Sequence, residues 1–105
     1  MTYYFLDNEY YFGRDGIYGF FDDCERFVFY SRAVLEMLRY IDFKPDIINA
    51  NDWQAAMIPV YYEVFYKYQQ GYENIKMYLL SIIFSIRVIT ERKYLMKLWD
   101  FRCII

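Results

Sequence analysis

The chain has 105 residues, the length of one small domain, and 58% of them are hydrophobic, so a packed core is expected. Its formal net charge of -2 argues against a protein that binds the nucleic-acid backbone, because such proteins carry a basic face. The chain contains no histidine, which excludes histidine-based acid–base catalysis, histidine-containing triads and histidine metal sites.

The first half of the chain is predicted to form a strand, a loop and one long helix. Tyr3 to Leu6 is predicted to be a strand, and "GRDGIYGFFDD", with three of the four glycines, a surface loop. Asp22 and Glu25 have the spacing of a capping box and predict a helix over about Asp23 to Arg39. The apolar residues that recur at helical spacing in it are Cys24, Phe27, Tyr30, Val34, Met37 and Leu38.

The second half is predicted to continue with a strand, a helix and a further strand. Pro45 favours extended backbone around it, and Ile47 to Ala50 is short and apolar enough to be a central parallel strand. Trp53 to Gln69 has a helical pattern, with Pro59 near a kink or in an early turn, and Gly71 ends it. "NIKM" then approaches another strand. This order of elements indicates an α/β fold with a parallel sheet.

The stretch "INANDWQ" places a carboxylate where α/β proteins bind ligands. Asp52 follows the predicted strand and precedes the helix that Trp53 opens. In open α/β folds, residues at the carboxyl ends of parallel strands contact ligands. The alternative is that Asp52 only caps its helix by accepting backbone N–H bonds, and spacing alone favours this alternative.

The aromatic residues, the cysteines and the longest apolar run indicate where the protein is located and how it packs. Aromatic residues make up 25% of the chain, and packing dispersed through the core and its boundary is favoured over a sugar-stacking surface. Cys24 and Cys103 lack metal-ligand spacing, so free thiols in a reducing compartment are expected. No signal-peptide pattern is visible, and the longest apolar run, Tyr78 to Ile86, is about half a bilayer span. A soluble cytoplasmic protein without a membrane segment or a metal site is expected.

Three stretches of the sequence together resemble a known family. They are "YFLDNEYYFGR", "YGFFDDCERFVFYSRAVLEML" and "FKPDIINANDWQAAMIPVYY", and they lie between Tyr4 and about Met77. They closely resemble the bacterial glycogen synthases and plant starch synthases of glycosyltransferase family 5, which transfer glucose from ADP-glucose to the end of an α-1,4-glucan. The resemblance implies that this segment is a fragment of a Rossmann-like parallel sheet, in the amino-terminal half-domain of a GT-B glycosyltransferase.

The resemblance implies roles for five residues. Asp52 matches the acidic residue of the "DW" motif at the cleft between the two domains, which makes it the catalytic candidate. Tyr18 matches a tyrosine of the glycine-containing loop near the sugar, and Asn51, Trp53 and Gln54 complete the substrate-binding candidates. For Trp53, packing of the helix start against the sheet is favoured over sugar stacking. No cofactor is implied, because ADP-glucose is a substrate; the implied partners are ADP-glucose and the glucan.

Several segments that the family needs for catalysis and substrate binding are expected to be missing from the 105 residues. No lysine-glycine-glycine loop for the nucleotide sugar precedes Met1, and the carboxy-terminal domain that neutralises the departing diphosphate is absent. Half a cleft can neither clamp the leaving group nor position the acceptor hydroxyl. The 105 residues alone are therefore expected to be inactive.

The resemblance stops after Met77, where family members read approximately "VFTIHNIQYQGNYG" and this chain reads "YLLSIIFSIRVITE". Met77 must be ATG and Tyr78 must begin TA, so reading one nucleotide earlier gives GTA, valine. Each later triplet that spans two neighbouring codons in this shifted frame, through Thr90, can encode the amino acid that the family has there. We infer a one-nucleotide frame slip at or just before codon 78, so that residues 1–77 are a partial catalytic domain and residues 78–105 an out-of-frame tail without the family's histidine. The alternative is a genuine variant tail that packs as a strand and a helix.

The leading hypothesis is a fragment of a cytoplasmic, ADP-glucose-dependent glycogen synthase. Two alternatives stay open. One is a non-catalytic module that binds glucan or a protein partner through exposed Tyr and Phe side chains, and the other is a pseudogene product without function. A glucan-binding titration separates the module from the enzyme fragment, since the module needs measurable affinity from this chain alone.

Overall fold

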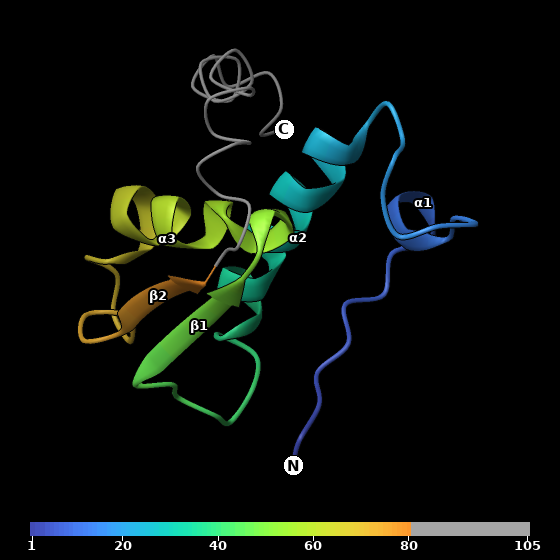
Figure 1. The fold of residues 1–105 in the computed structure, drawn as a ribbon. Coiled ribbons are helices and arrows are strands. Elements are labelled where there is room, and N and C mark those ends of the chain that lie inside the picture. Colours follow the sequence, from blue (N-terminus) through green and yellow to red (C-terminus); the bar gives the residue numbers. More distant parts are fainter. Residues whose placement is uncertain (81–105) are drawn as a thin grey trace.

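In the computed structural model of the protein, residues 1–80 are described, and they form an α/β arrangement (Figure 1). The elements, in chain order, are the helices α1 (Glu9–Phe12) and α2 (Asp23–Met37), the strand β1 (Ile47–Asn51), the 3-10 helix η1 (Trp53–Ala55), the helix α3 (Met57–Tyr61), the π-helix η2 (Tyr62–Tyr66) and the strand β2 (Lys76–Leu80).

The two strands form a parallel pair whose carboxyl ends meet at one edge. Their register runs from Ile47 opposite Lys76 to Asn51 opposite Leu80. A parallel pair needs a crossover connection, which η1, α3 and η2 supply. The predicted α/β class is confirmed, and so are two of the three predicted strands, the one over Ile47 to Ala50 and the one that "NIKM" approaches. Within residues 1–80, β2 is the one partner of β1, so the central position expected for β1 in a larger sheet stays a prediction.

The prediction of a strand from Tyr3 to Leu6 is wrong. The segment has no secondary structure and runs outward from α1 to the N-terminus (Figure 1). Tyr3 is 70% exposed and Phe5 is 87% exposed. A strand is stable only when its backbone groups pair with a neighbour, and no strand of the described region pairs with this one.

The bounds of α2 follow the prediction, whereas its buried face does not. The helix ends at Met37, within two residues of the predicted end. On the core side of the helix, the most buried side chains are Val28, Ser31 and Leu35. Of the apolar set predicted from spacing, Leu38 is buried, while Cys24, Tyr30 and Val34 pack only partly against the core. Ser31 lies on the core face, so a pattern based on hydrophobicity alone misplaces that face.

The predicted helical run from Trp53 to Gln69 is divided into η1, α3 and η2 and ends earlier, at Tyr66. Pro59 is the third residue of α3, where the missing N–H breaks no helical bond, which confirms the early-turn prediction. Gly71, with a φ of 92°, closes the turn that leads toward β2, and this positive φ explains why glycine stands there.

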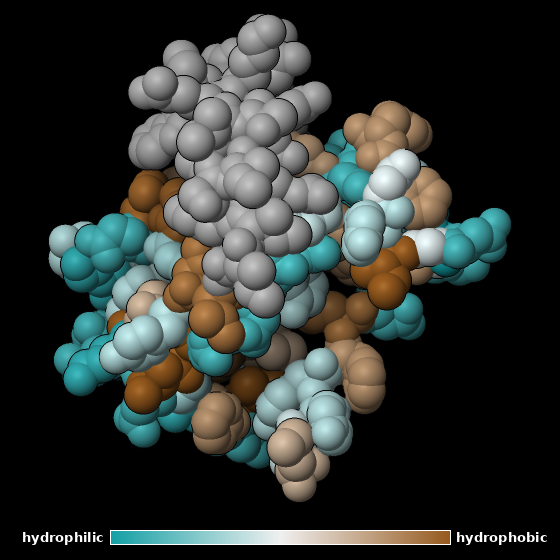
Figure 2. Space-filling view, viewed as in Figure 1, coloured by the Kyte–Doolittle hydropathy of each residue, from teal (hydrophilic) through white to brown (hydrophobic). Residues whose placement is uncertain are grey.

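Tyrosine hydroxyls join the helices to the turn before β2. Tyr72 Oη donates to the carbonyl of Leu35 at 2.7 Å, and Tyr62 Oη donates to the carbonyl of Tyr72 at 2.6 Å. Tyr66 Oη donates to Glu36 at 2.5 Å. Other large hydrophobic side chains reach the surface, where they are interspersed with hydrophilic residues (Figure 2). The aromatic residues are thus distributed between core and surface.

Candidate functional site

The backbone at Asp52 is unusual and lies where β1 ends. Its φ of 63° and ψ of -179° define a region that is essentially restricted to glycine, and Asp52 is the one non-glycine residue with positive φ in residues 1–80. The amide of Asp52 donates to the carbonyl of Leu80 at 2.8 Å, and its own carbonyl accepts from the amide of Ala55 at 3.2 Å. The end of β2 and the first turn of η1 therefore hold the strained residue in place.

The carboxylate of Asp52 contacts the helix that follows it. Oδ1 accepts from the amide of Trp53 at 2.8 Å, so a backbone bond of the kind that the capping alternative requires is present. An N-cap residue ordinarily keeps extended backbone dihedrals, however, and capping needs no positive φ. The strain at Asp52 is therefore an additional feature that capping does not explain.

Three aromatic rings, Tyr18, Phe27 and Trp53, form a group that we call the aromatic corner. The ring centroid of Trp53 lies 6.1 Å from that of Tyr18 and 5.0 Å from that of Phe27, with edge-to-face angles of 74° and 77°. Tyr18 comes from the glycine-containing loop and Phe27 from α2. Tyr18 is 58% exposed, so one wall of the corner faces solvent. The rings that contact Trp53 come from α2 and the loop, and its expected packing against the sheet stays a prediction.

The other two predicted site residues flank this region. Asn51 is the exposed last residue of β1, and its side-chain amide donates to the carbonyl of Asn49 at 3.3 Å. Gln54 is the middle residue of η1 and is partly exposed. The fold thus places Tyr18 beside the contiguous segment from Asn51 to Gln54, although Tyr18 lies far away in the sequence.

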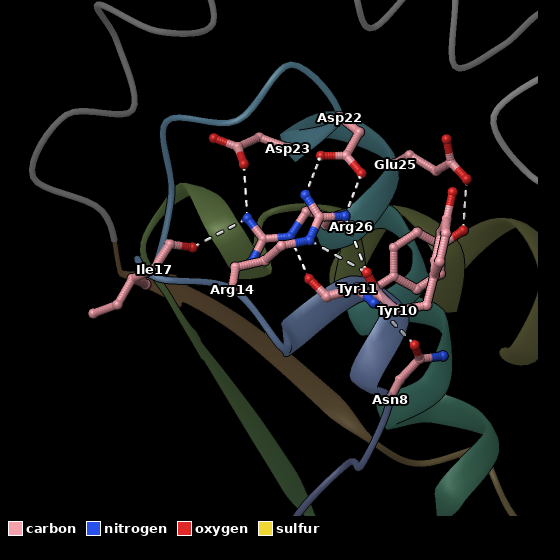
Figure 3. A network of polar contacts seen from close by, with 9 residues as sticks. All are labelled: Asn8, Tyr10, Tyr11, Arg14, Ile17, Asp22, Asp23, Glu25 and Arg26. Carbon is pink, nitrogen blue, oxygen red and sulfur yellow. Dashed lines mark hydrogen bonds and ion pairs between the residues drawn. The ribbon is translucent and has the colours of Figure 1, made fainter.

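The glycine-containing loop is fastened to α2 by an ion pair at its two ends (Figure 3). Arg14 donates to both oxygens of Asp22, at 3.1 and 2.8 Å. This bond lowers the pKa of the Asp22 carboxyl and raises the pKa of the Arg14 guanidinium. The predicted capping box is wrong, because the side chain of Asp22 makes no cap bond. Glu25 instead accepts from Tyr11 Oη at 2.6 Å, which raises the pKa of Tyr11 to about 12.

A second arginine, Arg26, is buried beneath the loop and was not singled out from the sequence. It donates to the carbonyls of Tyr11 and Ile17 and pairs with Asp23 (Figure 3). Arg26 and Leu35 are nine residues apart, about two and a half turns, so they point to opposite sides of α2. The hydrophobic periodicity of α2 describes the Leu35 side and gives no sign that a loop covers the other side.

The described part of the chain lacks the features of a metal site and of a membrane span. Residues 1–80 contain no group of three or more acidic or cysteine side chains arranged to hold a metal ion. None of their helices is long and apolar enough to cross a membrane. An open hollow of about 400 Å³ beside α1 is lined by Leu6, Asp7, Asn8, Glu9, Phe12 and Gly13. None of the five predicted site residues lines this hollow.

Comparisons with known proteins agree with the sequence resemblance. The glycogen synthase of Clostridium kluyveri is 54% identical over 86 residues, which are 82% of this chain and 17% of the relative. That of Finegoldia magna is 60% identical over 76 residues, 72% of this chain and 16% of the relative. That of Clostridium beijerinckii is 61% identical over 67 residues, 64% of this chain and 14% of the relative. No solved structure matches the chain significantly.

The chain covers only a small part of these relatives. It spans about a sixth of the length of these curated relatives. The family model for the starch synthase catalytic domain matches residues 1–88 and so extends past Met77, where the frame slip was inferred; the division of the chain at this residue stays a prediction. Because that match covers most of the sequence, this chain belongs to the starch synthase catalytic domain family.

Proposed function

We propose that this segment is the acceptor-side part of a Rossmann-like, amino-terminal domain of a GT-B glucosyltransferase. The whole enzyme transfers glucose from ADP-glucose to the non-reducing end of an α-1,4-glucan in the cytoplasm, with ADP-glucose as a substrate and no cofactor. Membership of the family, the relatives named glycogen synthase and the parallel pair of β1 and β2 support the proposal. The activity belongs to the whole enzyme, since the chain spans about a sixth of those relatives.

The observation that carries the proposal is the strained backbone of Asp52 at the carboxyl end of β1. Strain of this kind costs on the order of 1–3 kcal/mol and is concentrated at ligand and active sites. The position is also the one where open α/β sheets bind ligands. A residue that only capped η1 would adopt ordinary extended dihedrals at no such cost.

The chemistry of the transfer gives each candidate residue a role. As the diphosphate leaves, positive charge develops on the glucose ring, and a fixed carboxylate near that ring stabilises it. We assign this role to Asp52, whose orientation is set before the substrate arrives. The exposed edge of Tyr18 and the ring of Trp53 offer apolar contact to a sugar, and the amides of Asn51 and Gln54 can bond its hydroxyls.

A chimera tests the role of Asp52. Residues 1–77 replace the matching segment of the Clostridium kluyveri glycogen synthase, and kcat/KM and Tm are measured with and without Asp52→Asn. Asparagine caps a helix as well as aspartate, so Tm should hold, whereas kcat/KM should fall by about a hundredfold or more. The matched control is Asp42→Asn at an exposed loop position, which should change neither quantity.

Two results would contradict the assignment. If kcat/KM stayed near the parent value while Tm fell, Asp52 would be a structural cap without a catalytic role. If Asp42→Asn lowered kcat/KM as far as Asp52→Asn, the loss would reflect the general charge of the segment and not the site.

A second candidate, a non-catalytic glucan-binding module, is favoured by the exposed ring of Tyr18 next to Trp53. Stacking of a sugar on aromatic rings needs only the rings of this segment and no leaving-group site, so the chain alone would suffice to bind a glucan. Titration of the 105-residue chain with glycogen decides between the two. The enzyme proposal expects no measurable binding by the chain alone, whereas saturable binding that Tyr18→Leu abolishes would favour the module.

A further inference from the structure

Tyr18 is held on both sides by a partly buried ion pair at the start of α2. Arg26 Nη1 donates to the carbonyl of Ile17 at 3.2 Å, and Asp23 Oδ2 accepts from the amide of Gly19 at 2.6 Å. These bonds fix the backbone immediately before and after Tyr18. Arg26 and Asp23 are themselves joined at 2.7 Å, so the two bonds to the loop act as one unit.

The burial of Arg26 makes this unit rigid. Its side chain is 2% exposed, and that of Asp23 is 16% exposed. Arg26 Nε also donates to the carbonyl of Tyr11 at 2.6 Å, and the guanidinium lies 5.0 and 5.2 Å from the ring centroids of Phe20 and Phe27. Moving the guanidinium would leave buried donors and acceptors unsatisfied, which is more costly than breaking the same bonds in water.

The unit reaches the candidate catalytic residue through the aromatic corner. Phe27, which lies against the guanidinium of Arg26, has its ring centroid 5.0 Å from that of Trp53. Tyr18, between the two fixed backbone groups, meets Trp53 from the other side at 6.1 Å. Trp53 directly follows Asp52 and donates its amide to the carboxylate. The loop and α2 therefore both act on the residue next to Asp52.

We propose that Arg26 is a positioning residue, which acts through Asp23 and the carbonyl of Ile17 to fix Tyr18 against Trp53. Its importance for glucose transfer rests on the proposed function, whereas the positioning itself can be measured without a substrate. An ion pair that merely supported a helix end would lie at the surface, as does the pair between Glu36 of α2 and Arg39, which follows the helix.

Trp53 fluorescence in the full 105-residue chain provides the test. The background is Trp99→Phe, because the chain has two tryptophans and this change leaves Trp53 as the single indole. Acrylamide quenching of Trp53 and the rate of chymotryptic cleavage after Tyr18, identified by mass spectrometry, are measured for Arg26→Met, Arg26→Lys and Asp23→Asn. Tyr18→Leu gives the reference for a lost ring contact, and far-UV circular dichroism reports whether α2 persists.

The proposal expects Arg26→Met and Asp23→Asn to raise the quenching of Trp53 toward the Tyr18→Leu value. Cleavage after Tyr18 should accelerate by about tenfold or more, because it follows the population of the opened loop and each lost bond is charge-assisted. Arg26→Lys keeps the charge but cannot bond to Tyr11, Ile17 and Asp23 with the same geometry. Its quenching and cleavage rate should therefore lie between those of the parent and of Arg26→Met. The matched control is Arg39→Met, which removes an arginine that lies just after α2 and pairs with Glu36 three residues before it, and this change should leave Trp53 unchanged.

Wild-type quenching and cleavage in Arg26→Met and Asp23→Asn would overturn the proposal. So would an equal change in Arg39→Met, since the effect would then be general loss of an α2 ion pair. If Arg26→Met loses its helical signal, the results for Asp23→Asn decide the test. This variant should stay folded, because Asp23 is less buried than Arg26 and asparagine keeps a hydrogen-bonding amide. If the Asp52→Asn chimera keeps full activity while these changes in Trp53 occur, the proposed function fails and the positioning by Arg26 stands.

Discussion

Replacing Asp52 by glycine and by alanine should reverse the usual order of these two residues in stability. Glycine in place of alanine ordinarily destabilises by about 0.5–1 kcal/mol, because the unfolded chain gains freedom. At Asp52 the φ of 63° and ψ of -179° suit glycine and strain every other residue. Asp52→Gly should therefore be more stable than Asp52→Ala.

The magnitude follows from three contributions. Relief of strain in Asp52→Gly is worth about 1–3 kcal/mol, from which the entropy cost of about 0.5–1 kcal/mol is subtracted. Loss of the bond from the Trp53 amide costs only a few tenths of a kcal/mol with glycine, against about 1 kcal/mol with alanine. Asp52→Gly should thus be as stable as the parent or up to about 2 kcal/mol more stable, and Asp52→Ala about 1 kcal/mol less stable.

Urea denaturation of the 105-residue chain, followed by circular dichroism, measures this order. The matched control is Ala56→Gly, at a φ of -63°, which should lower stability by up to about 1 kcal/mol. In the chimera, both Asp52 variants should lose activity, because neither carries the carboxylate. If Asp52→Ala proved more stable than Asp52→Gly, the strained backbone would not exist in solution, and the argument that links strain to function would fall.

Two further predictions concern pH and the gene. Burial, and then the bond to Glu36, raises the pKa of Tyr66 to about 12, above its ordinary value of 10.0, so the unfolded state loses this proton first as pH rises. Stability should fall between about pH 10 and pH 12, and the fall should be smaller in Tyr66→Phe; an equal fall of the urea midpoint in parent and variant across this range would contradict the assignment. The nucleotide sequence read one base earlier from codon 78 should give Val-Phe-Thr-Ile-His-Asn, and codons for Ser81 to Ile83 that yield no His-Asn in that frame would refute the frame slip.

The regular elements near the site could be predicted because their signals are local. Helical spacing predicted the end of α2 to within two residues and Pro45 predicted where β1 begins, whereas the helical run that Gly71 was expected to end stops earlier, at Tyr66. Each of these signals restricts the backbone of its own neighbourhood. The prediction for Tyr3 to Leu6 failed because a strand depends on a partner that the segment itself does not specify.

The arrangement around Asp52 could not be predicted in the same way, because it depends on contacts between distant residues. Arg14 competes for the carboxylate of Asp22, so a capping motif with correct spacing makes an ion pair instead. Arg26 is buried by a loop and not by the core, and hydrophobic periodicity contains no information about loops. The positive φ of Asp52 is set by its bonds to β2 and η1, which no local preference of aspartate indicates.

Glucose transfer by the chimera tests directly whether this chain forms the acceptor-side wall of a glucan synthase site. Labelled ADP-glucose and glycogen are incubated with the chimera that carries residues 1–77, with the 105-residue chain alone, and with the intact Clostridium kluyveri enzyme as the positive control. We predict incorporation by the chimera within about tenfold of the intact enzyme, since the matched segments are 54% identical over 86 residues, and none by the 105 residues alone. A folded chimera without activity, or incorporation by the purified 105-residue chain above a heat-killed blank, would contradict it.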